Sequence, residues 1–157
     1  MIMKRREVCG FAEKIEIVKK CKVCNIAMLN GDMPYIVPMN FGYETSGETL
    51  TLYFHSAIKG LKLDCLRQNP NVCVEMDCDH EPFYNELPCK NGFKFASIIG
   101  TGKAEFLTQR DEKEKGINAL MLHQVGKTYT FTDRQLRSIE VIKVTLDAFT
   151  GKRRADL

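Results

Sequence analysis

A chain of 157 residues with 44% hydrophobic and 27% charged side chains has the composition of a globular protein, which excludes a disordered one and predicts a single domain over 1–157. The formal net charge of +3 is too small to indicate a nucleic-acid partner. We find neither a signal peptide nor an apolar run of membrane-spanning length, so we expect a cytoplasmic protein that does not bind membranes. Residues 1–10 and 152–157 are expected to form flexible tails.

The first half of the chain predicts one helix and two strands before its most informative stretch. Apolar residues at helical spacing indicate a helix over 11–20, and a strand follows over 23–29. The turn at 30–32 contains Asn30 and Gly31, which adopt the positive φ angles of a tight hairpin. A second strand is predicted over 35–43, where Pro38 indicates a sheet edge or a bulge because proline cannot donate to a ladder.

The third strand leads into the stretch around which we interpret the rest of the chain. Apolar and polar residues alternate over 50–55, as in a half-buried strand. We expect a turn at 55–57 and then a helix that starts near Ile58 and ends before Pro70. The strand would therefore deliver the hydroxyl group of Ser56 to the start of a helix.

Four residues of this stretch suit a phosphate group. Ser56 would supply a hydroxyl, and Lys59 and Lys62 would lie on one face of the helix. Gly60 would allow a ligand to approach the free amide groups of the first turn. The alternative reading is purely structural, with Ser56 as an N-cap and the two lysines on a solvated helix face.

The second half is less regular. It predicts, in order, strands over 71–77 and 95–106, separated by a long loop over 80–92, and then a helix over 109–123, a strand over 140–149 and a tail over 150–154. Gly100 and Gly102 indicate a bend or bulge in one strand. Thr132 and Gln135 have the spacing of a helix capping box. The whole pattern favours a mostly β protein of about six mainly antiparallel strands, forming a small barrel with peripheral helices.

Several strings of the sequence resemble one known family. The strings are PYIVPMNFGY at 34–43, LYFHSA at 52–57 with GLK at 60–62, VCVEMD at 72–77, SIIGTGKA at 97–104, IKV at 142–144 and TGKR at 150–153. Together they resemble the nitroimidazole-resistance (Nim-type) branch of the pyridoxamine 5'-phosphate oxidase-like flavoproteins, over nearly the whole chain.

This resemblance implies a split β-barrel that forms a homodimer with FMN at the subunit interface. It implies that residues 37–40 lie along the flavin ring, that residues 55–62 hold the phosphate and that residues 97–99 line the other side of the flavin. The cofactor-binding residues implied in this way are Val37, Pro38, Met39, Asn40, His55, Ser56, Ala57, Lys59, Gly60, Lys62, Ser97, Ile98 and Ile99. FAD or a deazaflavin could take the place of FMN. The basic residues at 152–154 could either reach a phosphate across the dimer or form a frayed tail.

The expected function is therefore an FMN-dependent oxidoreductase that takes electrons from NADH, NADPH or another donor and reduces a small organic acceptor, by analogy a nitro-aromatic compound. The alternatives are a non-catalytic flavin- or haem-binding protein, a cofactor-free dimer and a pyridoxamine phosphate oxidase. The last is disfavoured because those oxidases use arginine-rich strings, where this chain has Lys59 and Lys62. The sequence contains no GxGxxG motif, so we do not expect tight binding of a nicotinamide cofactor on a Rossmann unit.

One histidine is a candidate catalytic residue, and the other histidines and the cysteines are weaker candidates for a functional role. His55 is the one expected catalytic residue, because it lies beside the phosphate site and its unperturbed pKa is near neutrality. We interpret His80 as part of a polar loop rather than a metal ligand. The pair Cys21 and Cys24 lacks a second pair at zinc-site spacing, so no metal is predicted, and we expect reduced thiols for the seven cysteines.

Overall fold

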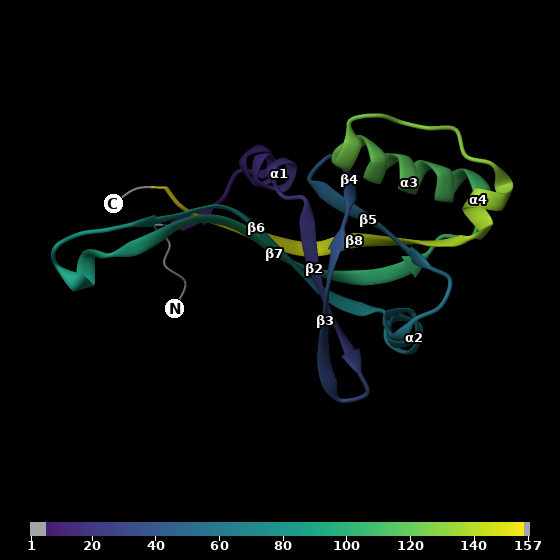
Figure 1. Ribbon diagram of the computed structural model, residues 1–157, viewed down its shortest axis with the longest axis horizontal. Coiled ribbons are helices and arrows are strands. Elements are labelled where there is room, and N and C mark those ends of the chain that lie inside the picture. Colours follow the sequence, from purple (N-terminus) through teal and green to yellow (C-terminus); the bar gives the residue numbers. More distant parts are fainter. Residues whose placement is uncertain (1–5, 156–157) are drawn as a thin grey trace.

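The computed structural model describes residues 6–155, which fold around one eight-stranded antiparallel sheet (Figure 1). The strands are β1 (Glu7–Val8), β2 (Val23–Asn30), β3 (Met33–Asn40), β4 (Gly42–Ser46), β5 (Thr49–Ala57), β6 (Asn71–Phe83), β7 (Gly92–Phe106) and β8 (Ile139–Arg154). The helices are α1 (Phe11–Lys20), α2 (Leu61–Gln68), α3 (Arg110–Val125) and α4 (Asp133–Arg137), with a short 3₁₀ helix η2 (Pro88–Lys90). The expectation of a mostly antiparallel β protein with a few helices is confirmed, although there are more strands than the six expected.

The sheet does not close into a continuous barrel. Its strand order is β3-β2-β6-β7-β8-β5-β4, and β1 pairs with β8. Within residues 6–155, no ladder joins the two end strands β3 and β4, although only Phe41 separates them in the chain. β3 therefore pairs on one side only, with β2, and leaves main-chain groups on its other edge without a strand partner.

The predicted strand over 35–43 is divided at Phe41. The Phe41 side chain is fully buried, and Gly42 begins β4 directly against the main chain of α3. A Cβ atom on Gly42 would collide with the main chain of Ala119 and Leu120. The close approach of α3 thus requires glycine at position 42. β3 ends at Asn40, one residue before Phe41.

β5 is buried on both faces over residues 50–54. Leu50, Leu52 and Phe54 are fully buried in the main core, which α1 and α2 also contact. On the opposite face, Tyr53 packs in a smaller cluster with Val141 and residues of α3 and α4. The alternation of apolar and polar residues predicted a half-buried strand, so the burial of Thr51 and Tyr53 on the second face is a correction to that prediction.

Three local predictions are confirmed. The helix over 11–20 has the predicted bounds. The ladder between β7 and β8 shifts register at Thr101 and Gly102, as the glycines in this strand indicated. Thr132 caps α4, because its hydroxyl accepts a hydrogen bond from the Gln135 amide while the Gln135 side chain accepts one from the Thr132 amide.

Two predicted irregular segments are strands in part. Residues 80–83 and 92 of the expected loop extend β6 and β7, whereas residues 84–91 connect these two strands as a loop that contains η2. The outer part of this hairpin, which includes residues 84–91, extends away from the rest of the molecule as an arm (Figure 1). The expected tail over 150–154 is the end of β8, where Gly151 and Lys152 pair with β1. The outer parts of the predicted tails, 1–5 and 156–157, lie outside the described residues.

Within residues 6–155, every helix is too short or too polar to cross a lipid bilayer. In the same range, no three His, Cys, Asp or Glu side chains gather as a metal ion would require. All seven cysteines are free thiols.

Candidate functional site

The corner between β5 and α2 differs from the turn that the sequence predicted. β5 continues through Ala57, because His55, Ser56 and Ala57 pair with Val141, Glu140 and Ile139 of β8. α2 begins only at Leu61, with Gly60 as its N-cap. The prediction of a turn at 55–57 is therefore wrong, and Ser56 is a strand residue rather than a helix cap.

The start of α2 is open to a ligand. No side chain caps Gly60, and the first amides that bond within the helix, those of Leu63 and Asp64, donate to the Gly60 oxygen at 3.0 and 3.3 Å. The amide groups of Leu61 and Lys62 precede these bonds, as expected for the first turn of a helix. No atom lies within 4 Å of a Cβ built on Gly60, so the space beside this turn is free.

Gly60 also has a backbone conformation that favours glycine. Its φ of 149° and ψ of 157° lie in a region that residues with a Cβ rarely adopt. This conformation lets the chain pass from the end of β5 into α2 between two lysines. Lys59 precedes the helix and Lys62 lies in its first turn, so the prediction that both share a helix face is wrong, but both still flank the open helix start.

His55 and Ser56 point to opposite faces of β5. The Ser56 side chain is buried, whereas His55 and Ala57 on either side of it are exposed. Partial burial and, secondly, the positive charge of Lys62 lower the pKa of the His55 imidazole. At neutral pH the ring is therefore mainly uncharged and lies within electrostatic reach of Lys62.

The face of β5 that carries Ser56 is occupied by structural contacts. Arg67 of α2 pairs with Glu140 at 3.3 Å, and its guanidinium lies 4.7 Å from the centre of the Phe106 ring. Glu140 is the direct β8 neighbour of Ser56. These contacts place the Ser56 hydroxyl on the side of β5 away from His55. The hydroxyl therefore does not contribute to an exposed phosphate site beside His55.

The predicted residues of β3 fall on two faces. Val37 and Met39 pack in part against the main core, whereas Pro38 and Asn40 are exposed. The Asn40 side chain donates hydrogen bonds to the Lys22 main-chain oxygen at 3.0 Å and to the Gln124 side chain at 3.4 Å. The unpaired edge of β3 thus offers main-chain groups to a ligand, while the side chain of Asn40 is held by other parts of the protein.

Residues 97–99 of β7 also divide between two faces. The Ile98 side chain is fully buried in the main core and cannot contact a ligand on the outside. Ser97 and Ile99 face outward and line a shallow depression with Thr150 and Lys152 of β8. Sequence reasoning did not place these β8 residues beside Ser97, because the predicted strand ended at Phe149.

The β5–α2 corner and the outer face around Ile99 are far apart within one chain. His55 pairs with Val141, whereas Ile99 pairs with Thr150, nine positions further along β8. At about 3.3 Å per residue this is about 30 Å along the strand. The structure therefore brings His55 and Lys62 within electrostatic reach at the corner that also carries Lys59 and Gly60, but it does not bring them to residues 97–99 of the same chain.

Comparisons with known proteins agree with this fold. A sequence model of the Pyridoxamine 5'-phosphate oxidase family matches residues 12–153. The crystal structure of a candidate 5-nitroimidazole antibiotic resistance protein from Bacteroides thetaiotaomicron is similar with a TM-score of 0.83 and 31% identity, covering 96% of this chain and 90% of that chain. A search of curated proteins found no match.

Two more distant structures share the fold. The FAD and heme binding protein from Mycobacterium smegmatis has a TM-score of 0.83 at 14% identity, covering 96% of this chain and 74% of that chain. An FAD-binding protein from Mesorhizobium loti has a TM-score of 0.67 at 18% identity, covering 96% of this chain and 98% of that chain. The family match spans nearly all of the described residues, and from it we conclude that this chain belongs to the Pyridoxamine 5'-phosphate oxidase family.

Proposed function

We propose that this protein is a homodimeric FMN-binding oxidoreductase that reduces a small organic acceptor of the nitro-aromatic class. The observation that carries the proposal is the open start of α2, where Lys59 and Lys62 flank the uncapped Gly60. Membership of the Pyridoxamine 5'-phosphate oxidase family and the likeness to the 5-nitroimidazole resistance protein support it. Two structures of the same fold are described as FAD-binding.

The residues at this corner fit the phosphate of a flavin nucleotide. The amides of Leu61 and Lys62 point out of the helix start, and the positive end of the helix dipole favours an anion there. Lys59 and Lys62 would neutralise the phosphate as two point charges. The same corner would accept the phosphate of FAD or of a deazaflavin. It would therefore select for a phosphate group rather than for a particular flavin ring.

A second copy of the chain would complete the site. Ile99 lies about 30 Å along β8 from the strand position that pairs with His55, farther than one FMN extends. The outer sheet face that carries Ile99 also exposes Val23 and Ile36, which are 47% and 61% exposed. Burial of this face against a partner would cover apolar surface and bring the partner's residues 97–99 to the flavin held by the first chain.

FMN, when bound, would supply the two-electron chemistry, accepting a hydride equivalent from NADH or NADPH and returning electrons to the acceptor. The protein would hold the phosphate at Lys59 and Lys62 and present main-chain groups of β3 to the ring. His55 would orient the substrate through its imidazole, which the lowered pKa keeps uncharged at neutral pH. Its neutral form can accept a proton from a neighbouring group.

The experiment that tests this function is anaerobic reduction followed by reoxidation. The purified protein is saturated with FMN, and the flavin absorbance is bleached with NADPH or NADH in the absence of oxygen. We expect a 5-nitroimidazole to restore the oxidised flavin spectrum at a rate proportional to protein concentration. Bleaching without reoxidation would favour a non-catalytic flavin-binding protein, and failure to bind FMN at all would contradict the proposal.

A further inference from the structure

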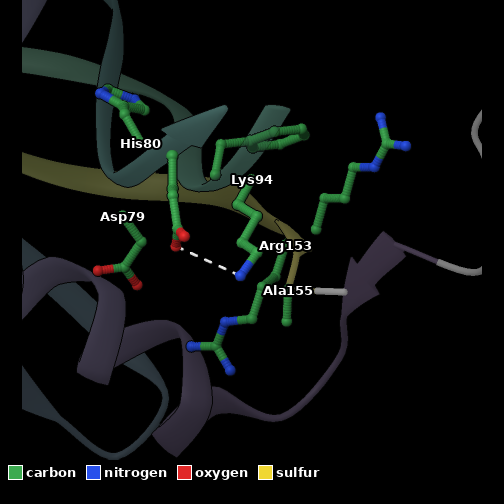
Figure 2. Close-up of a pocket in the computed structure, with 8 residues that line it drawn as sticks. Asp79, His80, Lys94, Arg153 and Ala155 are labelled. Atoms are coloured by element: carbon green, nitrogen blue, oxygen red, sulfur yellow. Dashed lines mark ion pairs between the residues drawn. The ribbon is translucent and has the colours of Figure 1, made fainter. Parts of the chain in front are cut away.

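A second pocket, of about 450 Å³, lies at the base of the arm, at the opposite end of β8 from the β5–α2 corner (Figure 2). It is lined by Asp79, His80, Glu81, Lys94, Phe95, Arg153, Arg154 and Ala155. The proposed flavin site uses none of these residues. The volume lies in the range of sites for small organic molecules.

Arg153 is a pocket residue that forms no ion pair with a carboxylate among residues 6–155. The two carboxylates in the pocket have other partners, since Asp79 pairs with Lys20 of α1 at 2.7 Å and Glu81 pairs with Lys94 at 3.3 Å. Within residues 6–155, no carboxylate lies within ion-pair distance of Arg153. The Lys20 ammonium is near enough to Arg153 for the two positive charges to repel each other.

The strand register places the side chains of Arg153 and Lys94 on the same face of the sheet. Arg153 pairs with Ala96, and Lys94 is two residues before Ala96 on β7, so both side chains lie on the same face of the sheet. The Ala96 side chain itself is fully buried. Figure 2 shows the Lys94 and Arg153 side chains extending into the same space, with Asp79 across from them.

The wall of this pocket contains a strained residue. The β6–β7 ladder shifts register between Cys78 and Glu81, and within this bulge Asp79 has a φ of 59°. Among the described residues, Asp79 is the sole non-glycine with a positive φ. Bulges and left-handed non-glycine residues are concentrated at functional sites, where they redirect side chains.

The neighbouring residue Arg154 is held in place on the other side of β8. Its guanidinium lies 4.6 Å from the centre of the Phe83 ring. Gly92 leaves room for this stacking, because a Cβ there would collide with Phe83 and would lie 2.8 Å from the Arg154 guanidinium. This stacking joins the end of β8 to the arm beside the pocket.

We propose that this pocket binds a small organic anion bearing a phosphate or carboxylate group, with Arg153 as the main ligand and Lys94 as the second. The planar guanidinium of Arg153 presents paired donors that match either oxyanion, and the Lys94 ammonium, which also pairs with Glu81 at 3.3 Å, would add a second positive charge. The volume beyond the two cations accommodates the organic part of the molecule. The site does not depend on the flavin proposal.

The test is isothermal titration at low ionic strength with inorganic phosphate, phenyl phosphate and benzoate. The last two share a ring and differ in the oxyanion, so they distinguish a phosphate site from a carboxylate site. We expect saturable binding of at least one of them to the wild-type protein. We expect roughly tenfold or greater weakening in the K94A/R153A double variant, since a hydrogen bond to a charged group contributes about 1.5–3 kcal/mol.

Three variants make the result specific. Lys103 is exposed on the same strand as Lys94, so K103A should bind as the wild type does. R153K retains the charge and should bind more tightly than R153A, which separates loss of the ligand-binding charge from misfolding. Each titration is repeated with K59A/K62A as the parent protein, which removes the phosphate site proposed at the start of α2, and it should give the same affinity and the same loss on adding K94A/R153A. No saturable binding of the three compounds, or equal affinity in wild type and K94A/R153A, would overturn the proposal whether or not the protein binds FMN.

Discussion

Lys62 in the first turn of α2 and His55 on β5 are electrostatic neighbours. Partial burial and then the charge of Lys62 lower the pKa of His55 below its ordinary value of 6.5. This relationship joins the end of the strand to the start of the helix across Gly60, the position where the chain changes direction. The positive charge that acts on His55 is the same charge that we propose for phosphate binding.

The K62A substitution should raise the pKa of His55, because it removes one of the two effects that lower it. The pKa can be measured from the pH dependence of the His55 ring-proton shift in NMR spectra. The matched control K103A, which removes an exposed lysine from β7, should leave the value unchanged. An unchanged pKa in K62A would show that Lys62 does not act on this imidazole.

The lowered pKa also sets the pH dependence of stability. Because folding lowers the pKa of His55, the folded protein binds fewer protons than the unfolded chain just below pH 6.5. The free energy of unfolding should therefore rise with pH through this window and fall as the pH drops below it. His123 contributes in the same direction, since burial lowers its pKa too. Urea titrations of wild type and H55N should show a weaker pH dependence for H55N.

The G42A substitution should destabilise the protein by about 3 kcal/mol or more, because the added Cβ would collide with the main chain of α3. G10A is the matched control, since Gly10 has a φ of −68° and its nearest atoms belong to the flexible Glu13 side chain. Chemical denaturation compares the two variants. Equal stability of G42A and G10A would contradict the close packing of β4 against α3.

Ile98 and Ile99 offer a matched pair on adjacent positions of β7. I98A should cost about 2–5 kcal/mol of stability because it empties a fully buried site in the main core. I99A should change the stability of the isolated chain by less than about 0.5 kcal/mol, since this side chain is 48% exposed. Analytical ultracentrifugation should show weaker dimerisation for I99A. The reverse order of stabilities would contradict the strand register.

The T132A substitution should lower the stability by about 1 kcal/mol, because it removes the hydroxyl that caps α4. T132S retains this hydroxyl and should behave nearly as the wild type. Denaturation in urea measures both. A loss in T132S as large as that in T132A would show that the methyl group, rather than the cap, stabilises this helix.

Local signals were sufficient where the structure depends on local interactions. The helix over 11–20 and the Thr132 capping box follow from side chains within a few residues of each other. Strand ends were less predictable, because β8 comes from the far end of the chain and extends β5 through Ala57. The sequence could not reveal this pairing, so the predicted turn came several residues too early.

In the candidate site, too, features set by local sequence were predicted, and features set by distant strand pairing were not. Gly60, Lys59 and Lys62 were identified from their spacing, and the structure places them around an open helix start. The opposite orientations of Ser56 and His55 were missed, because they depend on which face of β5 is buried against α2. Arg153 was expected either in a tail or at a phosphate across the dimer, because nothing near it in the sequence shows that its strand pairs with β7.

The central claim is that the β5–α2 corner holds the phosphate of the flavin, and the most direct measurement is the FMN content of the K59A/K62A variant. Each protein is saturated with FMN, passed through a gel-filtration column and assayed by absorbance, with K103A/K127A as a control of equal charge. We predict that K59A/K62A loses most of its flavin while its far-UV circular dichroism is unchanged, and that the control retains the wild-type content. Full retention of FMN by K59A/K62A would contradict the account.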